Sequence, residues 1–233
     1  HEASSLASED AVVQWRAASD SHSGAQDDRS TNGGRRVFLK APSDDDVPSE
    51  TIEDVIVRRG STRQFARESI AFGQLSTLLG RATRGIPADF LSAGDSLNQL
   101  YLIAHAVDDL KPGAYVYRRD LHALELLKEG DFRRDAGDLG LGQDIPADCS
   151  VNVYFLADLN RALDRFGNRG YRAAQLEASI IGGKLYLAAY AQGLGASGLT
   201  FFDDDVTEFF SPHAVGKSVM FLIALGKSVK RKS

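Results

Sequence analysis

Residues 171–192 read YRAAQLEASIIGGKLYLAAYAQ and predict one long helix at the centre of a hydrophobic core. The segment is apolar nearly all round at helical spacing, as in a helix that is buried on every side. Gly182 and Gly183 lower helix stability at its middle, so we expect another element to pack very close there. Gly193 and Gly195 predict the C-terminal end of the helix. The apolar positions are Leu176, Ile180, Ile181, Leu185, Leu187 and Tyr190.

Strand patterns lie on both sides of this helix in the sequence. Residues 151–158 (VNVYFLAD) have the pattern of a strong strand. Residues 219–226 (VMFLIALG) are apolar at nearly every position, as expected of a central strand that is buried on both faces. Three earlier strands, separated by turn residues, are predicted at residues 100–107, 114–118 and 122–127. Two short helices are predicted at residues 51–59, with Thr51 as N-cap, and at residues 69–83.

The chain is predicted to divide into a linker with an extended N-terminal arm, residues 1–47, and one folded domain, residues 48–233. The first 35 residues are rich in Ser, Ala, Asp and Gly, a composition typical of linkers, although a short helix around residues 9–17 is compatible with it. Val37 and Leu39 could pair in an extended arm. The chain begins with His1, which suggests a segment taken from a longer protein.

Composition excludes several classes of function. The formal net charge is −5 and the Arg residues are scattered among acids, which argues against a nucleic-acid-binding domain. Cys149 is the only cysteine, so we expect no disulfide framework, no thiolate metal cage and a reducing, cytoplasmic location. The five histidines lack the spacing of metal ligands, and no apolar stretch reaches the ~20 residues of a membrane helix. We therefore expect neither a metal nor a membrane partner.

Residues 58–65 read RRGSTRQF and combine three guanidinium groups with two hydroxyls, which is chemistry suited to a phosphate ester. Arg59, Ser61 and Arg63 alternate, so in an extended segment they would point to one side and converge on one anion. Phe65 could anchor the segment in a core. The alternative is a solvated basic turn. Arg58 is interpreted as a charge at the end of the preceding helix.

Two further patterns indicate no cofactor or metal. Residues 193–198 match G-x-G-x-x-G, but they follow a predicted helix instead of a strand, so the geometry of a dinucleotide site is absent. Asp203, Asp204 and Asp205 could suggest a cation site. Three acids before an apolar stretch more often form the N-cap and first turn of a helix, here residues 204–210.

The ordered motifs of this chain resemble the nitroreductase superfamily, and specifically its SagB-type branch. That branch contains azoline dehydrogenases and the oxidase domains of nonribosomal peptide synthetases. The resemblance implies an α+β, nitroreductase-like fold with a mixed central sheet, flanking helices and a long buried core helix. It also implies an intertwined homodimer that binds FMN. The motifs are RRGSTRQF, LSAGDSLNQLYLI, LKPGAYVYRRDLHALELLKEGDFR, RFGNRGYRAAQLEAS, KLYLAAYAQGLGASGLTFFDDD and VMFLIALGK.

The same resemblance assigns roles to individual residues. Arg59, Ser61 and Arg63 match the positions that hold the FMN phosphate and ribityl chain. The loop that approaches the isoalloxazine ring from the partner subunit corresponds to Ser92, Ala93 and Gly94. The loop at the reactive edge of the flavin corresponds to Gly198, Leu199 and Thr200. Arg231, near the C-terminus, could reach the phosphate.

The chain departs from the family at the positions that carry catalysis. Azoline dehydrogenases have a Lys-Tyr pair, as base and proton relay, where this chain has Arg165 and Phe166. Neither side chain can act as a general base. The flavin loop is also only partly preserved, with Leu91 and Asn98 where relatives commonly have proline. We expect the chemistry to be decided at Arg165 and Thr200.

The resemblance therefore implies an FMN-dependent oxidase or dehydrogenase of peptide natural-product biosynthesis. Its substrate would be an azoline or a carrier-tethered aminoacyl group, and a carrier protein or neighbouring synthetase domains would be partners beside the second copy of the chain. The alternative is a catalytically degenerate flavin-binding or docking domain of the same fold. A nitro or quinone reductase that uses NAD(P)H is a third, less favoured reading.

Overall fold

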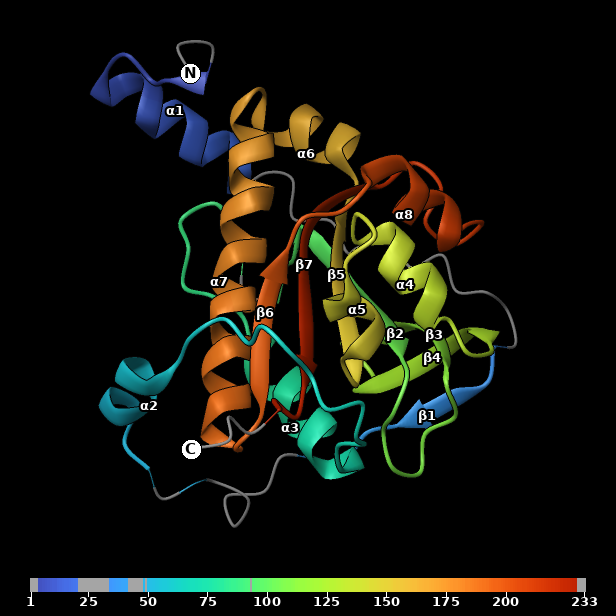
Figure 1. Cartoon of the computed structure of the whole chain (residues 1–233). Coiled ribbons are helices and arrows are strands. Elements are labelled where there is room, and N and C mark those ends of the chain that lie inside the picture. Colours follow the sequence, from blue (N-terminus) through green and yellow to red (C-terminus); the bar gives the residue numbers. More distant parts are fainter. Residues whose placement is uncertain (1–3, 21–33, 42–47, 49, 93, 230–233) are drawn as a thin grey trace.

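A seven-stranded sheet forms the centre of the molecule in the computed structural model, which describes residues 4–20, 34–41, 48, 50–92 and 94–229 (Figure 1). The strand order is β1-β4-β3-β2-β5-β7-β6, and every pair of these strands is antiparallel. The parallel part of the predicted mixed sheet is limited to an isolated bridge between Ile70 and Val107. The strands are β1 (Arg36–Phe38), β2 (Asn98–Ala104), β3 (Gly113–Arg118), β4 (Ala123–Glu129), β5 (Val151–Ala157), β6 (Gly195–Leu199) and β7 (Ser218–Gly226).

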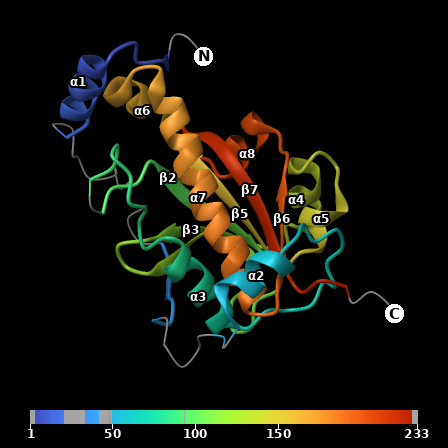
Figure 2. The ribbon, with the colours of Figure 1, turned by 90° about the vertical axis from the view of Figure 1, so that its left-hand side faces the viewer.

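Helices cover both faces of the sheet. Helices α7 and α3 lie on one face, and α4, α5 and α8 lie on the other (Figures 1 and 2). The two faces bury separate clusters of apolar side chains, the first against α3 and α7 and the second against α4 and α8. The helices are α1 (Glu9–Asp20), α2 (Ile52–Arg58), α3 (Phe72–Ala82), α4 (Arg133–Leu139), α5 (Asp144–Asp148), α6 (Leu159–Phe166), α7 (Arg169–Ala191) and α8 (Asp203–Phe209).

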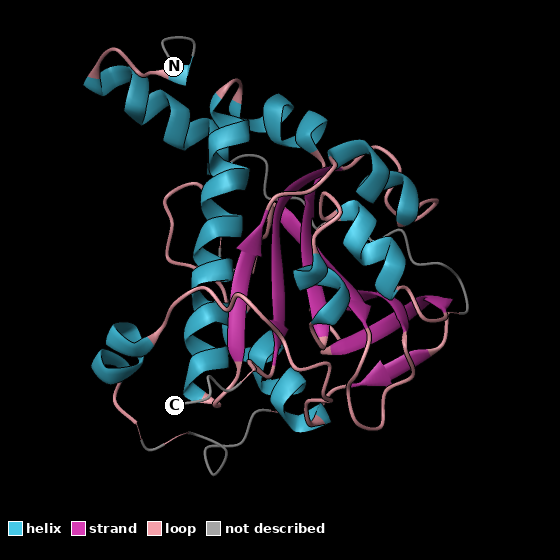
Figure 3. Cartoon of the chain, viewed as in Figure 1, coloured by secondary structure: helices cyan, strands magenta, loops and turns pink. Residues whose placement is uncertain are grey.

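The strands and helices predicted from periodicity are confirmed, with small shifts at their ends (Figure 3). Strand β6 was not predicted, because GASGL lacks the branched and aromatic residues typical of strands. It is the edge strand beside β7, and it contains Gly198 and Leu199, two of the three residues we expected in a loop near the flavin; Thr200 follows its end. The three consecutive acids lie in the first turn of α8 as predicted, although the N-cap is Phe202.

Helix α7 is buried along one face only, which corrects the prediction that it is buried all round. Small residues line much of that face and let the helix lie close to the sheet. A Cβ added to Gly182 would lie 2.6 Å from the Phe221 ring, so the predicted close packing is confirmed there. The prediction is wrong for Gly183, where a Cβ would meet nothing within 4 Å. Leu176 is 51% exposed, and Ile180 and Leu187 are half-buried.

The end of α7 also differs in part from expectation. Gly193 follows the helix with φ of +71°, the left-handed conformation that favours glycine after a helix end. Gly195 is instead the first residue of β6. A Cβ there would lie 2.2 Å from the Thr62 hydroxyl, so the glycine permits a close approach of the two chain segments. The G-x-G-x-x-G pattern therefore spans a helix-to-strand turn, the reverse of the order that a dinucleotide site requires.

Part of the predicted linker is ordered against the domain. Helix α1 packs on α6, where the Trp15 ring lies 5.8 Å from the Phe166 ring, and β1 pairs with β4. The domain boundary at residue 48 stays a prediction. Among the described helices, none is long and apolar enough to cross a membrane. The described residues contain no group of three or more His, Cys, Asp or Glu side chains arranged to hold a metal ion.

Candidate functional site

The segment after α2 is fixed to the edge of the sheet and to the end of α7. Thr62 is its buried residue: its N–H donates to the Ala196 carbonyl at 2.8 Å, and its hydroxyl lies 3.3 Å from the Tyr190 hydroxyl. Tyr190 also donates to the Gly60 carbonyl at 2.9 Å. Sequence reasoning missed both Thr62 and Tyr190. The segment is therefore held at three points between residues 60 and 62.

Arg59, Ser61 and Arg63 flank these anchors and are exposed. Arg58 is neutralised, because Glu50 forms an ion pair with it and it also donates to the Tyr190 carbonyl at 2.9 Å. This pairing supports the interpretation of Arg58 as a helix-end charge. No carboxylate in the described part of the chain pairs with Arg59 or Arg63. Two uncompensated guanidinium groups and a hydroxyl on a fixed segment fit a phosphate ester.

The residues predicted at the reactive edge of the flavin lie at the end of β6. Gly198 donates its N–H to the Tyr186 hydroxyl, so this N–H is already satisfied within the subunit. Leu199 packs against the core beside Phe65, and Thr200 is exposed after the strand ends. The Ser197 hydroxyl is fully buried and has no hydrogen-bond partner among the described residues.

The loop that contains Ser92 and Gly94, called the Ser92 loop, meets α7 at Glu177. Gly94 has φ of +90°, and a Cβ there would meet nothing within 4 Å, so the loop surface is open. Ser96, Leu97 and Asn98 end the loop and bond to Glu177 of α7. Ala93 and Arg231 lie outside the described residues.

Arg165 and Phe166 form structural contacts in this chain. The Arg165 guanidinium lies 3.3 Å from the Asp95 carboxylate and 4.7 Å from the centre of the Phe166 ring. Phe166 is buried in a cluster with Phe90, and Trp15 packs against that cluster. The pair thus links α6, the Ser92 loop and α1. Its catalytic role stays a prediction.

The two groups of predicted flavin residues are held at different points along α7. Tyr190 holds the segment of residues 58–65, called the phosphate segment after its predicted role, and Glu177 holds the Ser92 loop. These positions are 13 residues apart on one helix, which corresponds to roughly 20 Å along its axis. The Ser92 loop could therefore belong to a flavin site together with the phosphate segment only if the site bridges this separation or if the loop comes from another subunit.

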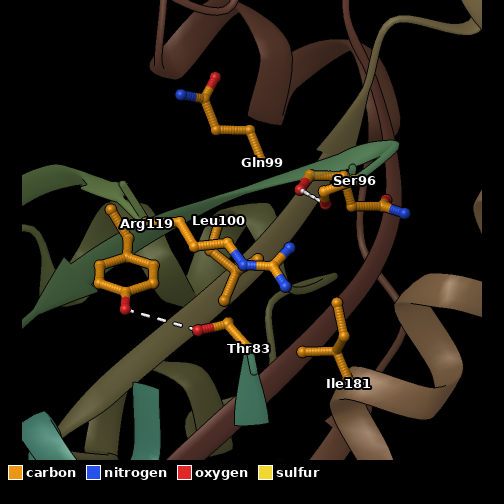
Figure 4. Close-up of a pocket in the computed structure, with 8 residues that line it drawn as sticks. Thr83, Ser96, Gln99, Leu100, Arg119 and Ile181 are labelled. Carbon is orange, nitrogen blue, oxygen red and sulfur yellow. Dashed lines mark hydrogen bonds between the residues drawn. The ribbon is translucent and has the colours of Figure 1, made fainter. Parts of the chain in front are cut away.

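A small pocket opens behind the Ser92 loop (Figure 4). The Arg119 side chain lies between Thr83 and Ser96 in this view, and Tyr117 and Thr83 lie with their hydroxyls 3.4 Å apart. Asn98 also lines the pocket, and its buried Oδ1 atom has no hydrogen-bond partner within the described structure. The pocket and the loop share Ser96 and Asn98, so a change in the loop would also change the pocket.

Comparison with protein-family models matches residues 56–227 to the nitroreductase family. The chain belongs to the nitroreductase family. This family match confirms the predicted fold. Members of the family are FMN-dependent oxidoreductases, which supports the predicted cofactor. The match covers the phosphate segment, the Ser92 loop and β6.

Individual relatives agree with this assignment. A protein of Methanocaldococcus jannaschii named as a nitroreductase is 21% identical over 191 residues, covering 79% of this chain and 95% of the relative. A nitroreductase structure from Anabaena variabilis has a TM-score of 0.73 and 26% identity over 84% of this chain, which spans 42% of that protein's length. A chain of the Escherichia coli microcin synthetase complex McbBCD, solved with truncated pro-MccB17 bound, has a TM-score of 0.62 at 16% identity, covering 83% of this chain and 79% of that one. At this identity the microcin synthetase shows a shared fold, and the SagB-type assignment stays a prediction.

Proposed function

We propose that this nitroreductase-family chain is an FMN-dependent oxidoreductase that oxidises an azoline or a carrier-tethered aminoacyl group in peptide natural-product biosynthesis. The observation that carries the cofactor assignment is the pair Arg59 and Arg63 beside Ser61 on a fixed segment, which no carboxylate of the described residues neutralises. The substrate assignment rests on the resemblance to SagB-type enzymes. The structural similarity to a synthetase complex that holds truncated pro-MccB17 supports it.

The residues of this chain have distinct tasks in the proposed site. Arg59 and Arg63 would bind the FMN phosphate and Ser61 would donate to it, while Thr62 and Tyr190 keep these groups in place. When bound, FMN would supply a two-electron acceptor for a substrate C–H bond, with dioxygen or another acceptor as the final oxidant. Thr200 offers an exposed hydroxyl at the end of β6 that could orient a substrate. Arg165 is always protonated, so it can hold a carboxylate but cannot take a proton from substrate.

A homodimer completes the proposed site. Leu176, Ile180, Gly183 and Leu187 recur at helical spacing on the α7 face away from the sheet, and none of them is buried. A second copy covering this stripe would bury apolar surface that a monomer leaves in water. It would also allow the Ser92 loop of one subunit to approach the phosphate segment of the other. A carrier protein or neighbouring synthetase domains remain further proposed partners.

Flavin binding tests the proposed function directly. The purified chain, supplied with FMN, is expected to show the absorption bands of a bound flavin. Arg59→Ala and Arg63→Ala should each weaken FMN binding by about tenfold or more, because hydrogen bonds to charged groups contribute roughly 1.5–3 kcal/mol. Riboflavin, which lacks the phosphate, should bind the wild type and these variants equally.

Arg58→Ala is the matched control. It removes the same charge from the neighbouring position, but Glu50 already pairs with that charge. FMN affinity should therefore change less than twofold. A wild-type chain that takes up no flavin, or an Arg58 variant as defective as the Arg59 variant, would contradict the proposal.

A second candidate function is a flavin-binding or docking domain without catalysis. The contacts of Arg165 and Phe166 favour it, because the position of the relatives' catalytic pair is occupied here by an ion pair and a buried ring. The two candidates separate on turnover. Bound FMN that no azoline or tethered aminoacyl substrate reduces would support the second, whereas substrate-dependent bleaching of the flavin would support the first.

A further inference from the structure

Glu177 is a buried carboxylate on α7 whose hydrogen bonds all go to one loop. Glu177 is 1% exposed. Oε1 accepts from the Ser96 hydroxyl at 2.7 Å. Oε2 accepts from the Leu97 N–H, the Asn98 N–H and the Asn98 side-chain amide, each at 2.8 Å. One carboxylate therefore satisfies four donors from three consecutive residues.

This arrangement specifies the conformation of the chain between Gly94 and β2. A buried charged group is costly unless hydrogen bonds compensate it, so the loop and the carboxylate depend on each other. Asn98 adds a second link to α7, because its amide also donates to the Ala174 carbonyl at 2.9 Å. A neutral apolar residue at 177 would leave the buried N–H of Asn98 and the partly buried N–H of Leu97 without this acceptor.

Two ion pairs also hold the chain in this loop and just before it. Arg16 pairs with Asp89 at 2.7 Å, but both side chains are more than half exposed, so this pair contributes little. Arg165 pairs with Asp95 at 3.3 Å and is largely buried. Neither of these contacts fixes consecutive backbone groups as Glu177 does. Glu177 is therefore the main anchor of the loop.

We propose that Glu177 is a positioning residue that holds the Ser92 loop in the conformation that contacts the flavin bound by the partner subunit. The inference rests on the proposed function, since it takes the loop to be part of an FMN site. Glu177 itself touches neither cofactor nor substrate. It acts by keeping the loop in one binding-competent state, and the apparent affinity for flavin falls in proportion to the population of that state.

The proposal distinguishes Glu177 from the phosphate-binding residues. If Glu177→Ala lowers the competent population of the loop to about a tenth, FMN and riboflavin should both bind about tenfold more weakly. Arg59→Ala and Arg63→Ala should affect FMN alone. Glu177→Gln keeps one acceptor oxygen and should recover part of the affinity. Asp89→Ala removes an exposed carboxylate just before the loop and is the matched control. It should change the affinity for FMN and for riboflavin less than twofold.

The experiment measures FMN and riboflavin dissociation constants together with hydrogen exchange of residues 92–98 in the full chain. The expected result for both Glu177 variants is faster exchange in this loop and weaker binding of both flavins. Faster exchange with unchanged flavin binding would overturn the positioning role and leave a structural anchor. A wild type that binds neither flavin would overturn the proposed function itself, irrespective of the exchange data.

Mixed dimers test whether the anchored loop acts across the subunit interface. A chain with Arg59→Ala and Arg63→Ala is mixed with a Glu177→Gln chain. Glu177→Gln is used because, of the two Glu177 variants, it keeps one acceptor oxygen for the loop. In a mixed dimer, one site combines an intact phosphate segment with an intact loop from the other subunit. Tight flavin binding should therefore return in up to half of the sites of the mixed dimers. If the loop serves its own subunit, mixing restores no tight site, and the proposal as stated is wrong.

Discussion

The neighbouring glycines Gly182 and Gly183 allow a paired test of how α7 lies on the sheet. Replacing either one by alanine favours the helix by about 1 kcal/mol, because glycine is the poorer helix former. The two positions differ in their surroundings. A Cβ at residue 182 would lie 2.6 Å and 2.9 Å from two atoms of the Phe221 ring and 3.0 Å from the Ile223 side chain. A Cβ at residue 183 would meet nothing within 4 Å.

The expected difference follows from these distances. Contacts under 3.0 Å force Phe221 or the helix to move, and overpacking of a core typically costs about 1–3 kcal/mol. The helix-propensity gain is common to both variants and cancels in the comparison. Gly182→Ala should therefore be about 1–3 kcal/mol less stable than Gly183→Ala. For a chain of this size, each kcal/mol corresponds to roughly 2–4 °C in Tm.

Urea and thermal unfolding of the two variants provide the measurement. Unfolding is followed over a range of protein concentrations, so that the contribution of the proposed dimer, which depends on concentration, is separated from that of the fold. Equal stability of the two variants at every concentration would refute the reasoning, because α7 would then not be pressed against Phe221. Both variants replace glycine by alanine at neighbouring positions in the middle of α7, so a difference in helix propensity cannot explain the result.

Three further predictions concern buried groups. Burial lowers the pKa of His105 to about 4, so below pH 6.5 this side chain is protonated more readily in the unfolded chain than in the folded one. The free energy of unfolding should therefore fall by up to about 3 kcal/mol between pH 6.5 and 4. His105→Gln should remove this part of the pH dependence in urea unfolding. Burial raises the pKa of the Cys149 thiol to about 12, so a thiol reagent should react with native protein far more slowly than with protein in urea; equal rates would contradict this. Glu125 is fully buried with Arg118, so Glu125→Ala should cost about 3–5 kcal/mol in unfolding free energy, while loss of its more exposed partner in Arg36→Ala should cost less than about 1 kcal/mol.

The elements of the fold were predictable where burial imposes a period on the sequence. The apolar runs of β5 and β7 and the cap of α2 at Thr51 are local signals, and the structure contains them where they were predicted. Strand β6 gives no such signal. It is a strand because β7 supplies its hydrogen bonds and because glycine at 195 lets Thr62 approach. Thr62 is 133 positions before Gly195 and β7 begins at residue 218, so no local pattern in residues 195–199 could reveal the strand.

The sequence predicts the chemistry of the candidate site but not the partners that hold it in place. RRGSTRQF predicts an anion-binding segment because it places three guanidinium groups and two hydroxyls within six residues. The partners that fix it, Tyr190 and the Ala196 carbonyl, come from α7 and β6. Glu177 lies in the helix predicted to be apolar nearly all round, and its partners also come from a distant segment, residues 96–98. A single acid in such a helix is a signal that could have been used, because a buried carboxylate requires donors from elsewhere in the fold.

Arg165 and Phe166 stand where the resemblance to SagB-type enzymes predicts a catalytic Lys-Tyr pair, and in this chain both make structural contacts. Arg165 spans the ring of Phe166 and the carboxylate of Asp95, and Phe166 closes an apolar cluster that Trp15 of α1 completes. Both side chains are therefore committed to holding α1, α6 and the Ser92 loop together. A tyrosine at 166 would keep the ring but place its hydroxyl in this buried apolar cluster, and a lysine at 165 would lose the planar guanidinium that lies over the ring, while both gain groups able to exchange protons. Restoring them by Arg165→Lys with Phe166→Tyr should thus loosen α1 whether or not it adds turnover, and the two effects can be measured separately by hydrogen exchange of residues 9–17 and by substrate-dependent bleaching of the flavin.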